Sequence, residues 1–209
     1  MKWIIVLITI ILFADDKVFI KGGEYIIPKG DSFFIYNYPK TKIKLDSFYI
    51  DKYEITYEDV ANIDISLVPT YIDIEMDRHL AVNTLSYKEA EFICKKRGGD
   101  LPTEEQWIVA ASFDTKFHKY PVKFNIDDYV EDIVFVDELP KGVNGLYGML
   151  GNVWEMTKSS GKFVLVKGGS FFDYDKEELL DVRIRNYVLK KDVKLNSTIG
   201  FRCVYKDNK

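Results

Sequence analysis

The sequence predicts an α+β domain with few helices, short strands and much irregular loop. Two helix signatures separated by paired glycines lie within residues 86–112, whereas residues 17–50 contain only short apolar runs of strand length. From 113 to 143 the chain is polar and aromatic without a regular period. An apolar content of 47%, with 15% aromatic residues, is enough to build a core that supports such loops.

The first fourteen residues, MKWIIVLITIILFA, have the pattern of a secretory signal peptide. Lys2 precedes an uncharged run from Trp3 to Ala14 that is too short to span a bilayer comfortably. We therefore expect residues 1–14 to be removed and residues 15–209 to form one domain without a membrane span. This implies an exported, periplasmic protein. The alternative is that the N-terminal run is a buried strand.

The chain from 17 to 63 is expected to begin with strands and end in a short helix. The strand candidates are the runs VFI, EYIIP, FFIY and IKLDSFYI, and the alternation in the last of these suits a half-buried strand. Thr56 follows, and Asp59 stands three residues later. This spacing predicts a capped helix N-terminus at Thr56.

Residues 86–112 predict two helices joined by a tight turn. Ser86 and Glu89 have the spacing of a capping box at the start of the first helix. Gly98 and Gly99 then stop it, and Thr103 with Gln106 opens the second helix in the same way.

The later part of the chain predicts two strands and one glycine-rich segment. KFVLVKGGS at 162–170 is typical of a buried strand that ends in glycines, and IGFRCVY at 199–205 is typical of a last strand. NGLYGMLGNVWEMT at 144–157 contains three glycines. Glycine this dense destabilises a helix or strand, so the segment must bind an ion, turn a corner or pack Trp154.

Charge and cysteine usage exclude several kinds of function. The 33 acidic and 29 basic side chains give a net charge of −4, which argues against nucleic acid or an anionic membrane as the main partner. The two histidines form no HxxxH pair, so a zinc or iron site of His and Cys has little support. Two cysteines in an exported chain favour a disulfide, although a reactive redox pair stays possible if they are exposed.

Six segments together resemble the sulfatase-modifying-factor family, typified by the formylglycine-generating enzyme. The resemblance covers nearly all of the mature chain and implies an elaborated C-type-lectin-like fold, with short twisted sheets, two main helices and long loops held by ions and disulfides. The matching segments, in family order, are FYIDKYEIT (48–56), AVNTLSYKEAEFIC (81–94), LPTEEQW (101–107), NGLYGMLGNVWEMT (144–157), KGGSF (167–171) and IGFRC (199–203).

The resemblance implies two calcium sites. Calcium takes several oxygen ligands, and glycine lets backbone carbonyls approach the ion. Gly148 stands where the family supplies a side-chain oxygen, so one ligand is missing. The alternative is a bare turn with Trp154 buried and Glu155 bonded to backbone N–H groups. The implied calcium ligands are the carbonyls of Gly151 and Val153, the carboxylate of Glu155 and, at the second site, Asn125 and Ile126.

The resemblance also shows what this chain lacks. In the formylglycine-generating enzyme two cysteines after the GGSF motif bind copper(I) as thiolates, whereas the segment here, GGSFFDYDKEELLDVRIR, has none. Cys94 and Cys203 match positions that form a structural disulfide in some family members, so the resemblance implies that they are bonded to each other. We therefore expect neither copper binding nor formylglycine-generating activity.

A groove beside the GGSF motif is the candidate binding site. The segment that replaces the copper cysteines is acidic from 173 to 181, which predicts a divalent-cation or basic-partner site or, alternatively, a solvated loop. Arg185 could line the groove or pair with a core carboxylate. The candidate groove residues are Trp154, Ser170, Phe171, Asp173 and Arg185.

The function expected from the sequence is a non-catalytic ligand- or partner-binding module, whose partner is an envelope protein or a small ligand. The alternative is a periplasmic oxidoreductase of the same superfamily that uses carboxylates rather than cysteines. Some family members without the copper cysteines are associated with periplasmic oxidation chemistry, such as pyoverdine maturation. A third possibility is a structural component of an envelope complex.

Overall fold

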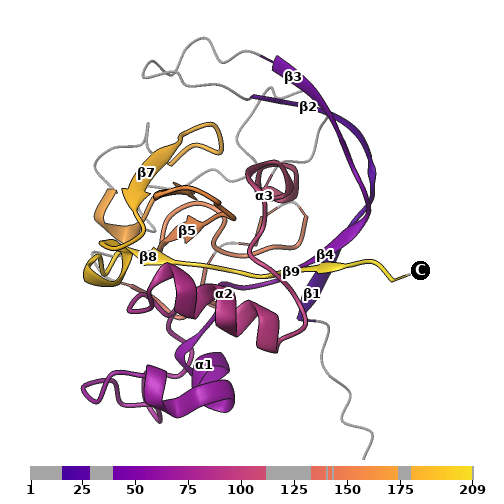
Figure 1. The fold of residues 1–209 in the computed structure, drawn as a ribbon. Coiled ribbons are helices and arrows are strands. Elements are labelled where there is room, and N and C mark those ends of the chain that lie inside the picture. Colours follow the sequence, from indigo (N-terminus) through magenta and orange to yellow (C-terminus); the bar gives the residue numbers. More distant parts are fainter. Residues whose placement is uncertain are drawn as a thin grey trace, which may run out of the picture.

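The computed structural model describes residues 16–28, 40–111, 133–139, 141–142, 144–173 and 180–208. Within these ranges short strands and three α-helices alternate with irregular segments (Figure 1). This is the α+β architecture that the sequence predicts. The expected signal peptide, Asn125, Ile126 and acidic positions 175, 177 and 178 lie outside the described residues.

Two antiparallel units form one side of the molecule. A three-stranded sheet has the order β1-β4-β9, and β2 pairs with β3 in a long curved ribbon (Figure 1). The helix α3 lies inside the curve of this ribbon, where its apolar side chains pack against both strands. The strands are β1 (Lys17–Ile20), β2 (Gly23–Pro28), β3 (Lys40–Leu45), β4 (Phe48–Asp51) and β9 (Val204–Lys206).

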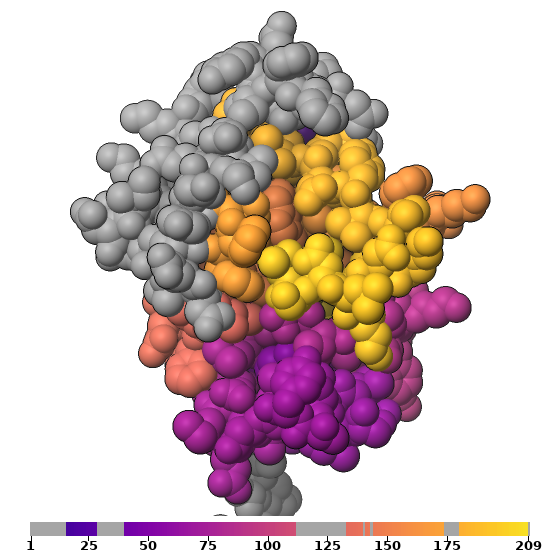
Figure 2. Space-filling model, turned by 90° about the vertical axis from the view of Figure 1, so that its left-hand side faces the viewer, coloured from indigo at the N-terminus to yellow at the C-terminus, as the bar shows by residue number. Residues whose placement is uncertain are grey.

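A second sheet of four strands carries the glycine-rich segments. Its order is β7-β6-β5-β8, with β5 and β8 parallel and the other neighbours antiparallel. On the face shown in Figure 2, the chain from 180 onward lies directly above the α1 region. The strands are β5 (Trp154–Met156), β6 (Phe163–Lys167), β7 (Asn186–Leu189) and β8 (Ile199–Gly200).

The helices begin where the capping signals predict. Thr56 and Ser86 each accept from the backbone N–H three residues on, and Thr103 and Gln106 exchange the same two bonds. None of the described helices is long and apolar enough to cross a membrane. The α-helices are α1 (Tyr57–Asp64), α2 (Tyr87–Lys96) and α3 (Glu104–Ala111), and the 3-10 helices are η1 (Ile65–Leu67), η3 (Phe171–Asp173) and η5 (Val193–Leu195).

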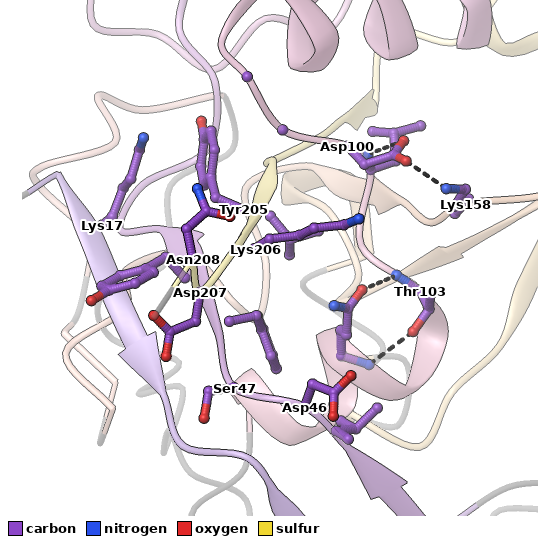
Figure 3. A pocket seen from close by; sticks show the side chains of 18 of the residues that line it. Lys17, Asp46, Ser47, Asp100, Thr103, Lys158, Tyr205, Lys206, Asp207 and Asn208 are labelled. Atoms are coloured by element: carbon purple, nitrogen blue, oxygen red, sulfur yellow. Dashed lines mark hydrogen bonds and ion pairs between the residues drawn. The ribbon is translucent and has the colours of Figure 1, made fainter.

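An open pocket of about 1200 Å³ lies between the β3–β4 turn, strand β9 and the loop from α2 to α3 (Figure 3). Its lining includes none of the predicted groove residues. Tyr205 on β9 forms part of the pocket lining, and its hydroxyl reaches Asp51 in the interior. The pocket therefore adjoins the part of the core that holds the disulfide.

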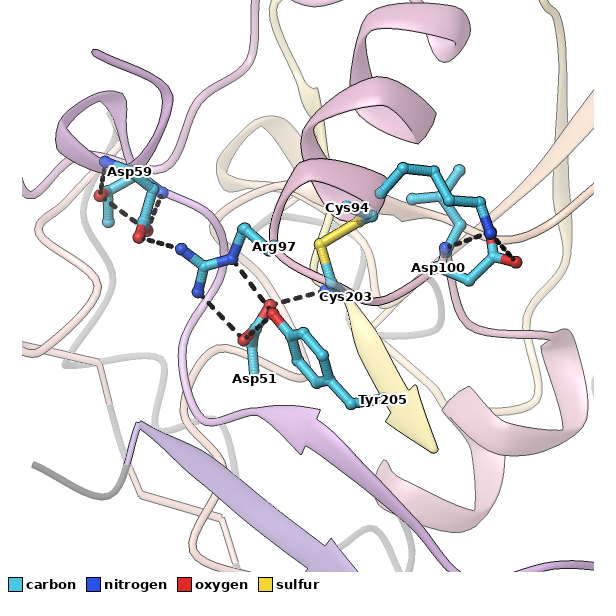
Figure 4. The surroundings of a disulfide bond; sticks show 10 residues. Asp51, Asp59, Cys94, Arg97, Asp100, Cys203 and Tyr205 are labelled. Atoms are coloured by element: carbon cyan, nitrogen blue, oxygen red, sulfur yellow. Dashed lines mark hydrogen bonds and ion pairs between the residues drawn. A yellow bond between two sulfur atoms is a disulfide. The ribbon is translucent and has the colours of Figure 1, made fainter. Parts of the chain in front are cut away.

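The disulfide joins α2 to the segment just before β9. Cys94 and Cys203 are fully buried, and their Cα atoms are 5.4 Å apart (Figure 4). Beside them Arg97 bridges the carboxylates of Asp51 and Asp59. This confirms the pairing implied by the family resemblance, and the burial excludes an exposed redox pair.

Candidate functional site

The glycine-rich segment before β5 is a chain of tight turns with left-handed residues. Gly145, Gly148 and Gly151 have φ angles of 82°, 65° and 84°, and Asn152 has a φ of 53°. A Cβ atom at Gly148 would lie 2.9 Å from Oε2 of Glu54. The backbone therefore favours glycine at 148, and Glu54 and Leu139 occupy the space that a side chain would need.

Glu155 is fully buried and is held by side chains rather than by backbone N–H groups. Arg202 donates to both carboxylate oxygens, from Nε at 2.9 and 2.8 Å and from Nη2 to Oε1 at 2.6 Å. Trp107 Nε1 donates to Oε2 at 2.7 Å. The expected backbone partners of Glu155 are thus wrong, whereas the expected burial of Trp154 is confirmed.

A second buried carboxylate, Glu54, lies beside this ion pair. Its Oε2 accepts from Asn152 Nδ2 at 2.7 Å, and its Oε1 has no hydrogen-bond partner among the described residues. Burial raises the pKa of Glu54 from its ordinary 4.5 to about 8, and the nearby Glu155 carboxylate adds to this shift. Glu54 is therefore mostly protonated at neutral pH.

These contacts do not fit the implied calcium site. A calcium ion at Gly151, Val153 and Glu155 would share the Glu155 carboxylate with the guanidinium of Arg202, a cation within hydrogen-bond distance. Like charges that close repel strongly in a site that excludes water. Arg202 already supplies the positive charge that the carboxylate needs. The second implied site, Asn125 and Ile126, lies outside the described residues.

Three of the five predicted groove residues meet at one carboxylate. Oδ2 of Asp173 accepts from Trp154 Nε1 at 2.7 Å, from the Ser170 hydroxyl at 2.7 Å and from the Ser170 backbone N–H at 3.0 Å. All three side chains are at most 9% exposed. Asp173 ends η3, and the positive φ angles of Gly168 and Gly169 turn the chain from β6 towards that helix. The GGSF motif thus brings Ser170 to the same carboxylate oxygen that the indole of Trp154 binds.

The other two predicted groove residues have different partners. The backbone N–H of Phe171 donates to the Asn152 carbonyl at 2.9 Å, which ties η3 to the glycine-rich segment. Arg185 pairs with Glu104, with Nε 2.8 Å from Oε1 and Nη2 donating to Oε2 at 3.0 Å. Since Glu104 is only 9% exposed, Arg185 pairs with a core carboxylate, as the alternative interpretation held.

Lys167 is a buried cation that the sequence reasoning missed. Its Nζ lies 3.8 Å from Glu104 Oε1 and has no hydrogen-bond partner among the described residues. Burial lowers the pKa of Lys167 from 10.5 to about 8, and Glu104 opposes this shift. The available signal was a single Lys that ends an apolar run, FVLVK, directly before Gly168. Glu54 carried a similar signal, one charge between the aromatic and aliphatic residues of KYEITY.

Comparisons with known proteins agree with the sequence resemblance. The family model described as "Sulfatase-modifying factor enzyme 1-like domain" matches residues 12–207. The protein "Inactive C-alpha-formylglycine-generating enzyme 2" of Mus musculus is 30% identical over 149 residues, which are 59% of this chain and 48% of that protein. "Serine/threonine-protein kinase Pkn1" of Chlamydia trachomatis is 25% identical over 237 aligned positions, 90% of this chain and 38% of that protein. This chain thus spans less than half the length of both relatives.

Solved structures share the fold at low identity. CarF superposes with a TM-score of 0.67 at 20% identity, covering 92% of this chain and 98% of CarF. PvdO from Pseudomonas aeruginosa gives a TM-score of 0.67 at 16% identity, covering 91% and 94%. Their agreement over almost the whole chain confirms the predicted fold. Because the family model matches nearly every residue, this chain belongs to the sulfatase-modifying-factor family.

Proposed function

We propose that this chain is an exported sulfatase-modifying-factor-like domain that binds a ligand or an envelope partner without oxidising cysteine. The observation that carries the proposal is the bond between Cys94 and Cys203. The sequence has no other cysteine, so no thiolate pair is available to hold copper(I). Copper(I) prefers soft sulfur ligands, and carboxylates are hard.

The contacts of Asp173 support a binding role. Its Oδ2 accepts from Trp154 and from both donors of Ser170, which fixes the carboxylate and orients the Ser170 hydroxyl towards it. In the Ser-His-Asp arrangement a histidine acts as the base for the nucleophilic serine. The one described histidine, His79, lies against Phe135. These three residues form a rigid element suited to shaping a groove.

The name of one relative is consistent with the proposal. The mouse relative carries the word "inactive" in its name, in a family whose reference activity is formylglycine generation. For this chain, the lack of formylglycine-generating activity is proposed from the missing cysteines rather than from that name. A kinase activity has no support here, because the match covers only 38% of the chlamydial protein.

A second candidate function is an oxidoreductase that uses carboxylates. The observation favouring it is the buried pair of Glu104 and Lys167 just before the GGSF motif, with Glu104 Oε1 3.8 Å from Lys167 Nζ. Burial lowers the pKa of Lys167 to about 8, so this amine can exchange a proton with the carboxylate around neutral pH. Lys167→Met separates the two functions, because an oxidoreductase that relies on this amine would lose turnover while a binding module would keep its ligand.

The test is an assay for formylglycine. The protein is incubated with oxygen, copper(I) and a Cys-containing sulfatase-type peptide, and the peptide is read by mass spectrometry against a no-protein control. We expect the peptide to keep its sulfur. The single variant Asp173→Cys should also be inactive, because two thiolates are needed to hold the ion. Loss of sulfur with gain of an aldehyde above the control would overturn the non-catalytic proposal.

A further inference from the structure

The open pocket is walled by parts of the chain that are far apart in sequence. The β3–β4 turn contributes Asp46 and Ser47, strand β1 contributes Lys17, and the far wall is the loop that leads into α3 (Figure 3). The capping residue Thr103 lies on that wall, so the N-terminal end of α3 borders the pocket. The volume of about 1200 Å³ is large enough for a ligand of several linked groups.

The lining of this pocket is basic, although the whole chain is acidic. Six cationic side chains and only three carboxylates line it, whereas the chain as a whole has a net charge of −4. The excess of positive charge is therefore local. The cations are Lys17, Lys44, Lys95, Arg97, Lys158 and Lys206, and the carboxylates are Asp46, Asp100 and Asp207.

Ion pairs within the protein neutralise only some of the cations that line the pocket. Lys95 and Lys158 both bond Oδ2 of Asp100, so two cations share one carboxylate. By contrast Lys44 and Lys206 form no ion pair with any residue in the described part of the chain. These two exposed ammonium groups therefore line the pocket without an ion pair to a described residue, as do the carboxylates of Asp46 and Asp207. Arg97 adds little to the excess of positive charge, because it is paired with Asp51 and Asp59.

The floor of the pocket gives an uncharged surface between these cations. Tyr205, Leu101 and Val204 line it, and the Nζ of Lys17 lies 3.5 Å from the centre of the Tyr205 ring. The loop at Gly99 packs so closely on β9 that a Cβ there would be 2.4 Å from the Val204 carbonyl oxygen. This contact fixes the far wall, so the pocket exists before any ligand arrives.

We infer that this pocket binds a ligand with two or more anionic groups, carboxylate, phosphate or sulfate, joined by an uncharged body that rests on the floor. Charge complementarity carries the inference, because five lysines and only three carboxylates line one concave surface, which leaves an excess of positive charge there. The inference is independent of the proposed groove, since the pocket shares none of its residues.

The experiment is calorimetric titration of the purified protein with three probes at low ionic strength, each with two anionic groups on a sugar body: glucarate, a hexose bisphosphate and a sulfated disaccharide. We expect at least one probe to bind, and its identity distinguishes carboxylate, phosphate and sulfate ligands. Affinity should fall as salt rises, because these cations are exposed and screened by ions. Lys44→Gln and Lys206→Gln should each weaken binding by about two- to fivefold.

The matched control is Lys42→Gln on the same strand as Lys44. Lys42 is exposed and paired with Glu24, and it does not line the pocket. Lys42→Gln removes the same charge from outside the pocket. The affinity for the probe should therefore fall less in Lys42→Gln than in Lys44→Gln or Lys206→Gln. Absence of binding by all three probes up to about 10 mM, weaker than typical specific affinities, would overturn the inference. Equal losses in Lys42→Gln and Lys206→Gln would also overturn it, since they would show a general charge effect.

Discussion

Arg202 and Glu155 form a two-pronged ion pair in which neither side chain is exposed to solvent. The pair joins the strand after the glycine-rich segment to the chain that leads into β9. Two further bonds extend it, from Arg202 Nη2 to the Tyr147 carbonyl at 2.7 Å and from Trp107 Nε1 to Glu155. The pair is therefore the point at which the two sheets and α3 are tied together.

Removal of one partner of this pair should be costly. Arg202→Met leaves Glu155 buried without a counter-charge, which should lower the free energy of unfolding by about 3–5 kcal/mol. Urea denaturation measures the change. Lys42→Met is the control, since it breaks an exposed ion pair with Glu24 and should cost less than about 1 kcal/mol. A similar decrease in the free energy of unfolding of both variants would show that the buried pair contributes no more to stability than an exposed one.

Gly148 should tolerate no side chain. Gly148→Ala meets both a positive φ angle and Glu54 Oε2, so it should lower the free energy of unfolding by about 2–4 kcal/mol. Gly98→Ala is matched in backbone, with a φ of 80° and nothing within 4 Å of the added Cβ, and should cost only about 1 kcal/mol. Thermal denaturation compares the two variants. An equal loss would mean that Glu54 leaves room at 148.

Glu54 should make stability depend on pH near neutrality. Its folded pKa of about 8 lies above the unfolded 4.5, so the folded state holds a proton that the unfolded state has lost. The free energy of unfolding should therefore fall as the pH rises from about 4.5 to 8, with a slope of at most about 1.4 kcal/mol per pH unit.

The variant Glu54→Gln isolates this effect. The amide does not titrate and can keep the contact with Asn152. The difference between the free energies of unfolding of Glu54→Gln and of the native protein should therefore shift in favour of the variant as the pH rises from 5 to 8. Urea denaturation at each pH measures the difference. A difference that is constant across this range would contradict the raised pKa.

We expect no tight binding of calcium at the glycine-rich segment. Arg202 occupies the Glu155 carboxylate that a calcium ion would need, so calorimetry should find no tight calcium site at Gly151 and Val153. Glu155→Gln gives the control, because heat that arises from calcium elsewhere on the chain would persist in that variant. A tight site that Glu155→Gln abolishes would show that calcium and Arg202 share the carboxylate.

The disulfide should contribute strongly to stability. It links residues 109 positions apart, and a loop of this size corresponds to about 5 kcal/mol in chain-entropy models. Urea denaturation of the double variant Cys94→Ala/Cys203→Ala measures the loss. Mass spectrometry of the non-reduced native protein should find no free thiol. Two cysteines that react freely with an alkylating agent would contradict the structure.

Local features of the fold could be predicted from the sequence, because each depends on neighbours in the chain. Ser86 and Glu89 are three residues apart, and their capping bonds form as expected. The fold class and the position of Ser170 followed from ordered motifs. These motifs fix both the path of the chain and the residues around it.

The partners of buried charges could not be predicted in the same way. Glu155 meets Arg202 from 47 positions away, and Glu54 meets Asn152 from 98 positions away. A single sequence contains no record of such pairings, only the sign that a charge in an apolar run needs some partner. An ion and a guanidinium satisfy that need equally well, and the sequence alone does not distinguish them.

The Cys203 backbone N–H donates a hydrogen bond to the Asp51 carboxylate, and the two residues are 152 positions apart. This separation limits when the sheet can form during synthesis. Strand β4 cannot gain its neighbour β9 until the ribosome has added all the residues between them. The growing chain therefore leaves the ribosome with this sheet open. The disulfide depends on the same last segment, so it can form only after Cys203 has been added to the chain.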